Sequence, residues 1–128
     1  MPRASERGAV AVEFALLAPV LIMILLGIME FGRAYNVQAT LTNAARDGVR
    51  VMAIDNSQAS ARTASKAAAT ALHPPLQDSN IEFLASDGSD KCSATKQITV
   101  TVKYTLSTMT GIAGPFAMTG KGTMLCGG

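Results

Sequence analysis

The chain has 128 residues, enough for one small domain and an anchor but too few for two domains with separate cores. Hydrophobic residues make up 48% and charged residues 16%, whereas a disordered chain needs low hydrophobicity and high charge. Eleven Lys and Arg against nine Asp and Glu leave +2 without a basic stripe, which argues against nucleic-acid binding. His73, Cys92 and Cys126 lack the short paired spacings of zinc sites, so we expect neither a metal nor a cofactor.

The N-terminal region begins with a short charged segment at 1–8, followed by an apolar run at 9–29 in which Glu13 is the one charge. As a helix this run is about 31 Å long, close to the roughly 30 Å hydrocarbon core of a bilayer. A buried core helix is the alternative, but about 90 remaining residues are too few to wrap a helix that is apolar on every side. We therefore predict a transmembrane helix at 9–29.

The charges on either side of this run predict its orientation. Arg3 and Arg7 precede it against Glu6, whereas Glu30 and Arg33 nearly cancel after it. The positive-inside rule then places the N-terminus in the cytoplasm. We expect a single-pass protein of the cytoplasmic membrane, with its C-terminal domain outside the cytoplasm, in the periplasm or at the cell surface.

Both cysteines lie in the part that is expected to be exported. An even pair in an oxidising compartment usually forms a disulfide. We predict a Cys92–Cys126 bond, with two unpaired thiols as the alternative.

Three kinds of membrane segment fit the apolar run: a cleaved secretory signal, a plain anchor and a prepilin-type leader. Signal peptidase needs small residues soon after the apolar core, and residues 37–39 offer them weakly and late. Gly8 directly precedes the run, and Glu13 and Phe14 follow at the fifth and sixth places after it. The string RG-AVAV-EF resembles substrates of the prepilin peptidase, which implies cleavage between Gly8 and Ala9 on the cytoplasmic side.

The longer string at 6–53 resembles the N-terminal region of the TadE-like family, pseudopilins that are minor components of the tight-adherence (Flp-type) pilus machinery. The matching features are Arg7-Gly8, Glu13-Phe14, Ala18-Pro19, Gly27, residues 30–33 and residues 44–50. The resemblance implies prepilin peptidase, other pilins or pseudopilins and the pilus secretion machinery as partners. It also implies that Glu13 pairs with the new α-amino group of Ala9 on a neighbouring subunit; the alternative is that Glu13 only snorkels to the membrane interface.

Beyond the membrane the helix is expected to continue over 30–54, because small and apolar residues recur at helical spacing from Val37 to Val51. Glu30 and Arg33 stand three residues apart on one face. They form either a surface pair or, through Glu30 at the outer edge of the bilayer, a contact to a partner subunit.

Residues 55–128 are predicted to form a small exported domain. A second helix capped by Ser57 or Ser60 runs to Leu72 and ends before two prolines. Strands are expected at 81–85, 97–106 and 116–125, with a turn at 86–90 that uses Gly88.

The strand at 97–106 alternates apolar and polar residues, and it should pair with 116–125 as a long hairpin. Gly120 and Gly122 in the last strand mark either a bulge or a close approach of another backbone.

The sequence thus predicts an α+β fold: a long N-terminal helix, one short helix and a small antiparallel sheet. We interpret it as a minor pseudopilin, processed by a prepilin peptidase, that takes part in assembling or anchoring a tight-adherence pilus. The alternative is a small secreted or membrane-anchored binding protein with a signal-peptidase leader. No spacing of Ser, His and Asp groups them into a nucleophilic site, so we expect no enzyme.

Overall fold

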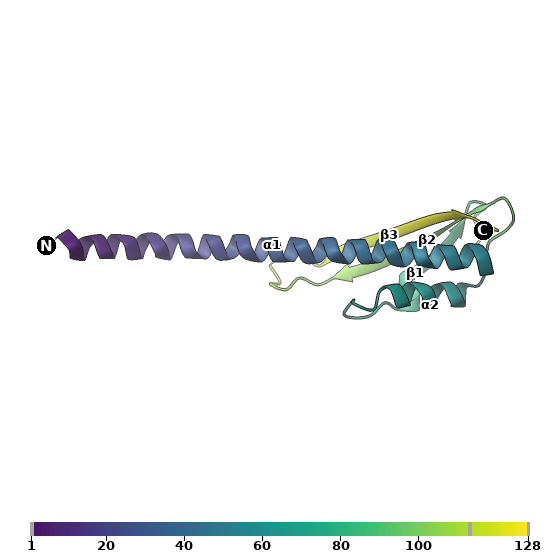
Figure 1. Cartoon of the computed structure of the whole chain (residues 1–128), viewed down its shortest axis with the longest axis horizontal. Coiled ribbons are helices and arrows are strands. Elements are labelled where there is room, and N and C mark those ends of the chain that lie inside the picture. The colour runs from purple at the N-terminus through teal and green to yellow at the C-terminus, as the bar shows by residue number, and fades with distance from the viewer. Residues whose placement is uncertain (1, 113, 128) are drawn as a thin grey trace. The chain divides into compact units, whose positions relative to one another are not determined.

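The computed structural model describes residues 2–112 and 114–127; Met1 of the predicted leader, and Ala113 and Gly128 of the predicted exported domain, lie outside the described residues. In chain order, the elements are α1 (Pro2–Asp55), α2 (Gln58–Ala68), the short 3-10 helix η1 (Asp78–Asn80), β1 (Ile81–Ala85), β2 (Gln97–Leu106) and β3 (Phe116–Leu125) (Figure 1). This order confirms the α+β fold. The chain divides into two compact units, an N-terminal unit of residues 1–33 and a C-terminal domain of residues 34–128.

The C-terminal domain is built on an antiparallel sheet in the order β1-β2-β3. Alternation along β2 gives the sheet one buried face, because Ile98, Val100 and Val102 have no exposed surface while Lys103 and Thr105 face solvent. The domain part of α1 (residues 34–55) covers this face together with α2. Its contribution to the core comes from residues at helical spacing, namely Val37, Leu41, Ala44, Ala45, Val49, Met52 and Ala53.

The two glycines of β3 let the sheet approach α1 at backbone distance. A Cβ at Gly120 would collide with the carbonyl group of Leu41, and one at Gly122 would lie 2.9 Å from the carbonyl oxygen of Ala45. The register of β2 and β3 runs unbroken from Gln97 opposite Leu125 to Leu106 opposite Phe116. Of the two readings of these glycines, the close backbone approach is therefore confirmed and the bulge is wrong.

The contact between α1 and α2 is equally close. Ser65 of α2 is fully buried, and its Oγ donates a 2.9 Å hydrogen bond to the carbonyl oxygen of Ala44. Gly48 makes room for that hydroxyl, because a Cβ at position 48 would collide with Ser65 Oγ. The small residues that the sequence places on α1 thus serve packing inside the domain.

The second helix begins as predicted but ends early. The Ser57 side chain accepts a 3.3 Å hydrogen bond from the backbone N–H of Ser60, which confirms Ser57 as the N-cap. The helix stops at Ala68 instead of Leu72. The chain turns there and buries both Ala69 and Leu72, so burial in the core overrides the helical preference of this stretch.

A disulfide joins Cys92 to Cys126, with their Cα atoms 5.6 Å apart, as the sequence predicted. The end of the chain is held further by backbone hydrogen bonds. The N–H of Cys126 donates to the carbonyl oxygen of Lys96 at 2.8 Å, and the N–H of Gly127 donates to that of Ala53 at 3.0 Å. The tail after β3 is thereby attached both to the segment before β2 and to the last turns of α1.

Candidate functional site on the N-terminal helix

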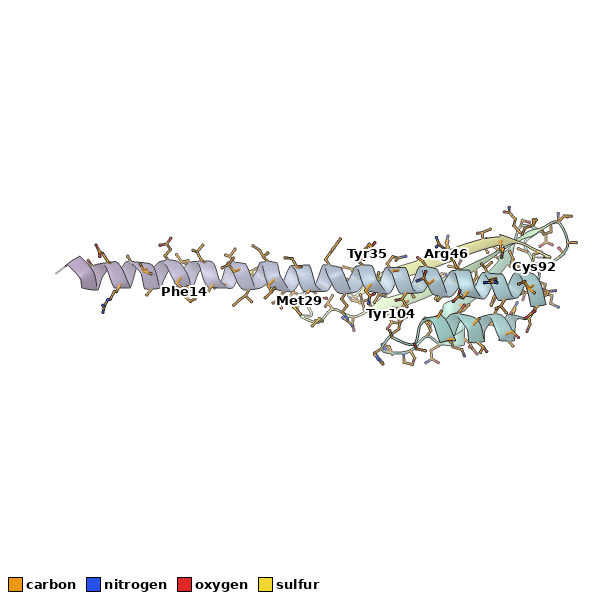
Figure 2. All side chains as sticks on the ribbon, in the orientation of Figure 1. Phe14, Met29, Tyr35, Arg46, Cys92 and Tyr104 are labelled. Atoms are coloured by element: carbon orange, nitrogen blue, oxygen red, sulfur yellow. A yellow bond between two sulfur atoms is a disulfide. The ribbon has the colours of Figure 1, made fainter. Side chains whose placement is uncertain are left out.

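The N-terminal unit is an apolar helix, and most of its described side chains are exposed. Among the residues that the structure describes, α1 is the one helix long and apolar enough to cross a membrane, and none of its most apolar window is buried. Phe14 and Met23 are each 70% exposed, and Figure 2 shows side chains projecting around this helix. Its length and its exposed apolar side chains would allow the helix to span a membrane.

Gly8 and Ala9, the residues of the predicted processing site, lie within α1 and are exposed. A Cβ added at Gly8 would meet nothing within 4 Å. The fold therefore has no steric need for glycine at this position, in contrast to Gly48 and Gly120 in the domain. A glycine inside a helix also weakens it by about 1 kcal/mol relative to alanine.

Glu13 and Phe14 follow on the same helix, and both are exposed. Among the residues whose side chains the structure describes, 5–112 and 114–127, no hydrogen bond or ion pair reaches the carboxylate of Glu13. Glu30 is half-buried at the end of the N-terminal unit. It lies seventeen residues beyond Glu13, about 26 Å along the helix axis. The predicted assembly residues thus form no single site within one chain.

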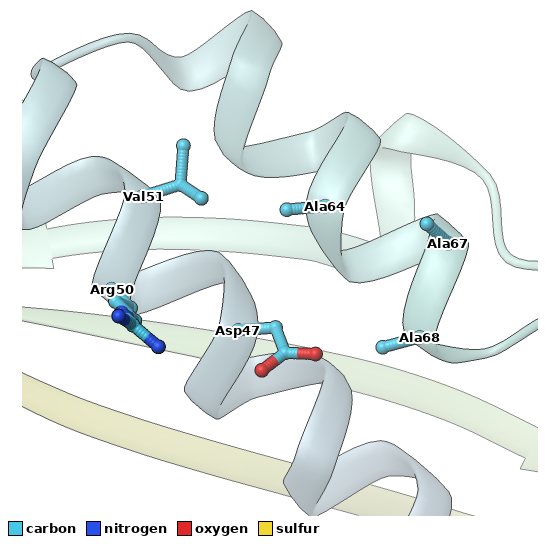
Figure 3. Close-up of a pocket in the computed structure, with 6 residues that line it drawn as sticks. All are labelled: Asp47, Arg50, Val51, Ala64, Ala67 and Ala68. Atoms are coloured by element: carbon cyan, nitrogen blue, oxygen red, sulfur yellow. The ribbon is translucent and has the colours of Figure 1, made fainter.

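An open groove between α1 and α2, which was not predicted from the sequence, has a volume of about 480 Å³ (Figure 3). Its lining consists of Asp47, Arg50, Val51, Ala64, Ala67 and Ala68. The groove exists because alanines of α2 leave space where longer side chains would fill it. The spacing of Ala64, Ala67 and Ala68 is the signal that could have indicated it. It holds one carboxylate, one guanidinium and no nucleophile.

Two exposed carboxyl groups of the domain are perturbed by local contacts. The Lys66 side chain, which forms a 2.6 Å ion pair with Asp78, lowers the pKa of that carboxyl. The hydroxyl and backbone N–H of Ser89 both donate to Asp87 and lower its pKa as well. Neither carboxyl group lines the groove. Within the described part of the chain, no three His, Cys, Asp or Glu side chains group as metal ligands.

The fold and this helix define a small α+β domain carried on a long helix whose N-terminal part is exposed and apolar. The family model of the TadE-like protein matches residues 8–50. The match covers about a third of the chain, begins at Gly8, and confirms the resemblance predicted from residues 6–53. No curated protein and no solved structure matched the chain.

Proposed function

We propose that this chain is a minor pseudopilin, processed by a prepilin peptidase, that helps to assemble or anchor a tight-adherence pilus. The observation that carries the proposal is the match to the TadE-like family, which starts at Gly8 and runs through the whole apolar helix. That family associates the chain with the Tad pilus system.

Processing between Gly8 and Ala9 is supported by a glycine at position 8 that the fold does not require. Nothing inside the chain requires a glycine at position 8, since a side chain there would meet open space. A protease that works at the membrane surface does benefit from glycine, because a flexible residue lets the backbone leave the helix and enter a narrow site. Removing 1–8 takes the leader charges away and leaves the apolar helix on the mature protein.

The membrane placement follows from the same helix. We place residues 9–29 in the cytoplasmic membrane with the N-terminus in the cytoplasm. Residues 30–54 continue the helix outside, and 55–128 complete the exported domain. The disulfide supports export, because disulfides persist in oxidising compartments and are rare in the cytosol. In this setting Glu13 lies inside the membrane edge and pairs with the Ala9 amine of a neighbouring pilin.

The alternative of a binding protein released by signal peptidase conflicts with the packing of the domain. Its cut would fall before Thr40, in the middle of α1. That cut would remove Val37, which is 7% exposed in the core. It would also remove Gln38, whose Nε2 donates a 2.8 Å hydrogen bond to the carbonyl oxygen of Thr119. The released form would lose part of the helix that covers β3.

The test is the mass of the mature protein after expression with an active prepilin peptidase. We expect a membrane-extracted form that begins at Ala9, 120 residues long because 8 of 128 are removed. Gly8→Glu should leave the full chain uncut, because a large charged side chain does not fit a site shaped for glycine. Ser5→Glu is the matched control: it adds the same side chain three residues upstream and should still be cleaved.

Each other mass contradicts the proposal in a different way. A form that begins at Thr40 would support the signal-peptidase alternative. A full-length chain in the presence of the active peptidase would identify a plain anchor. Cleavage of Gly8→Glu at the same rate as the natural sequence would remove the role assigned to Gly8.

A further inference from the structure

We propose that the described residues between β2 and β3 (residues 107–112 and 114–115, here the β2–β3 loop) are a second membrane contact. Together with Phe116 the loop enters the headgroup region of the bilayer that holds the N-terminal helix. The partner is a phospholipid surface. The inference rests on the proposed membrane span, and it adds a lipid-binding site in the C-terminal domain.

The first observation is the exposure of large apolar side chains on this loop. Ile112 is 85% exposed, the highest value among the large hydrophobic residues of the described chain. Met109 is 58% and Phe116 is 40% exposed. Exposed apolar clusters on a small protein mark a surface that contacts another phase or molecule.

The second observation is the absence of charge in the sequence around the loop. Residues 104–120 contain no Asp, Glu, Lys or Arg, and Lys103 and Lys121 bound this run. In a chain with 16% charged residues, seventeen uncharged positions would ordinarily include about three charges. A segment that enters the headgroup region must avoid acidic side chains, because moving a carboxylate toward lipid is costly.

The third observation is the position of the loop within the domain. Gly120 of β3 lies against Leu41 of α1, and Gly122 lies against Ala45, so β3 runs in the same direction as α1. Going back from Gly120 to Phe116 covers about 13 Å of strand. Going back from Leu41 to Ala34 covers about 10 Å of helix. The start of β3, and the loop before it, therefore lie at the Ala34 end of the domain.

The Ala34 end of the domain is also the end that is joined to the N-terminal unit. Ala34 is the first residue of the domain, and the residue before it is the last of the N-terminal unit. The proposed membrane-spanning segment is thus covalently joined to the same end of the domain that carries the loop. The other end of β3, with Leu125 and the disulfide, lies about 30 Å away along the strand.

Two backbone N–H groups of the loop already donate to side chains of the loop, which lowers the cost of removing water from them. The N–H of Gly111 donates to Thr108 Oγ1 at 3.0 Å, and the N–H of Ile112 donates to Thr110 Oγ1 at 3.4 Å. Pro115 has no N–H to satisfy. Unpaired backbone N–H groups would oppose transfer toward lipid, and at the tip of this loop side-chain hydroxyls already accept two of them.

The shape of the patch favours lipid over a protein partner. Three apolar side chains on a protruding loop offer far less than the roughly 800 Å² that each partner buries in a stable protein interface. A bilayer surface adapts to a small convex loop, and isolated aliphatic and aromatic side chains are favoured at the membrane interface.

Tryptophan fluorescence can test this directly, because the chain contains no Trp. The full chain carrying Ile112→Trp is reconstituted into vesicles of phosphatidylethanolamine and phosphatidylglycerol. A fraction of the lipid is brominated near the top of the acyl chains. We expect a blue-shifted emission and quenching several-fold stronger than for Leu125→Trp. The latter is the matched control, since Leu125 is also exposed, at 55%, and lies at the far end of the same strand.

Met23→Trp reports separately on the N-terminal helix and should be quenched by lipid brominated deeper in the acyl chains. Its quenching without that of Ile112→Trp would overturn the loop contact while leaving the membrane span intact. Failure of Met23→Trp to be quenched would overturn both. Equal quenching of Ile112→Trp and Leu125→Trp would show unspecific adsorption and overturn the inference. A blue shift of Ile112→Trp without quenching would show that the side chain is buried against protein, in its own chain or in a second copy, and would overturn it also.

Phe116→Trp is a second reporter, because it replaces one aromatic side chain with another at the edge of the loop. It keeps the test decisive if Ile112→Trp does not fold. We expect its quenching to lie between the values for Ile112→Trp and Leu125→Trp. A value equal to that of Leu125→Trp would contradict the inference.

Discussion

Glu13 is a carboxylate on an exposed apolar helix, and no described residue of its own chain pairs with it. A charge in that setting costs a few kcal/mol on membrane-insertion scales and is retained where it has a partner or a function. The partner that we propose is the Ala9 amine of a neighbouring subunit. The contribution of Glu13 then belongs to assembly, and the folding of the single chain does not depend on it.

Glu13→Gln tests this pairing, because it keeps the shape and removes the charge. We expect cleavage after Gly8 to persist, at least in part. Cross-linking between membrane-embedded subunits should fall, because the neighbour's ammonium loses its counter-ion, a cost on the order of 2–5 kcal/mol for a broken buried pair. The measurement is cross-linking and piliation at equal membrane abundance.

Glu30→Gln serves as the control for Glu13→Gln, since it makes the same chemical change about 26 Å further along the helix. If only Glu13 pairs with the Ala9 amine, Glu30→Gln should leave that cross-link intact. Normal cross-linking and normal pili in Glu13→Gln would refute the pairing. Glu13 would then be left as a residue that snorkels to the interface.

At the scale of elements, the domain depends on close backbone approach at small residues. Gly120 and Gly122 admit α1 to the sheet, and Gly48 admits the Ser65 hydroxyl between α1 and α2. A methyl group at Gly120 or Gly122 would collide with the backbone of α1, and one at Gly48 would collide with the Ser65 hydroxyl. The close spacing between these elements therefore depends on the absence of a Cβ atom at the glycines. The effect of adding that atom on the stability of the domain can be measured.

Gly48→Ala and Ser65→Ala should be strongly non-additive. Gly48→Ala alone should destabilise the domain by about 1–3 kcal/mol, as overpacking does. Ser65→Ala alone should cost about 1 kcal/mol for the lost hydrogen bond. In the double variant the added methyl no longer meets Ser65 Oγ, and alanine is favoured over glycine in a helix by about 1 kcal/mol. The double variant should therefore be more stable than Gly48→Ala.

The measurement is chemical denaturation of the four chains in the same detergent, combined as a double-mutant cycle. Thr119→Ala is the control, because it removes an exposed side chain next to Gly120 and should change stability by less than about 0.5 kcal/mol. Simple addition of the two single effects would contradict the contact between Gly48 and Ser65.

The strands could be predicted from sequence to the residue, because alternation and flanking turn residues are local signals. Residues 81–85, 97–106 and 116–125 match the observed β1, β2 and β3. The end of α2 could not be predicted, since it depends on the burial of Leu72 in a core that only the folded chain creates. The groove at Asp47 and Ala64 also depends on tertiary packing, so it was not predicted. Packing against α1 likewise decides between the two interpretations of Gly120, which the sequence alone left open.

The candidate site on α1 was more accessible to sequence reasoning than the fold around it. Gly8, Glu13 and Phe14 are recognisable by order and spacing in one helix, with no need for tertiary contacts. The proposed partners of these residues are other molecules. The structure of a single chain therefore shows only that the three residues are exposed and that no described residue pairs with the Glu13 carboxylate. The Cys92–Cys126 pair lay between these cases: two cysteines allow one pairing, and its existence depended on the compartment.

At the scale of the whole molecule, the disulfide closes the C-terminal domain over 34 residues of sequence. Replacing both cysteines, Cys92→Ser with Cys126→Ser, should lower the free energy of unfolding by about 2–4 kcal/mol. Circular dichroism during urea unfolding measures it, with the full chain in detergent. Reductant should lower the urea concentration at the unfolding midpoint of the natural chain and leave that of the double variant unchanged. An unchanged midpoint in the double variant would contradict a stabilising role for the bond.

The location of Cys126 also sets the order of events in time. The bond and β3 are made after the helix that they cover, because α1 precedes both in the chain. Until β3 has been synthesised, one apolar face of α1, with Leu41 and Ala45, has no cover from that strand. The domain is therefore completed only after β3 has been made. A chain interrupted before β3 presents that bare face, which makes it a natural substrate for chaperones and proteases.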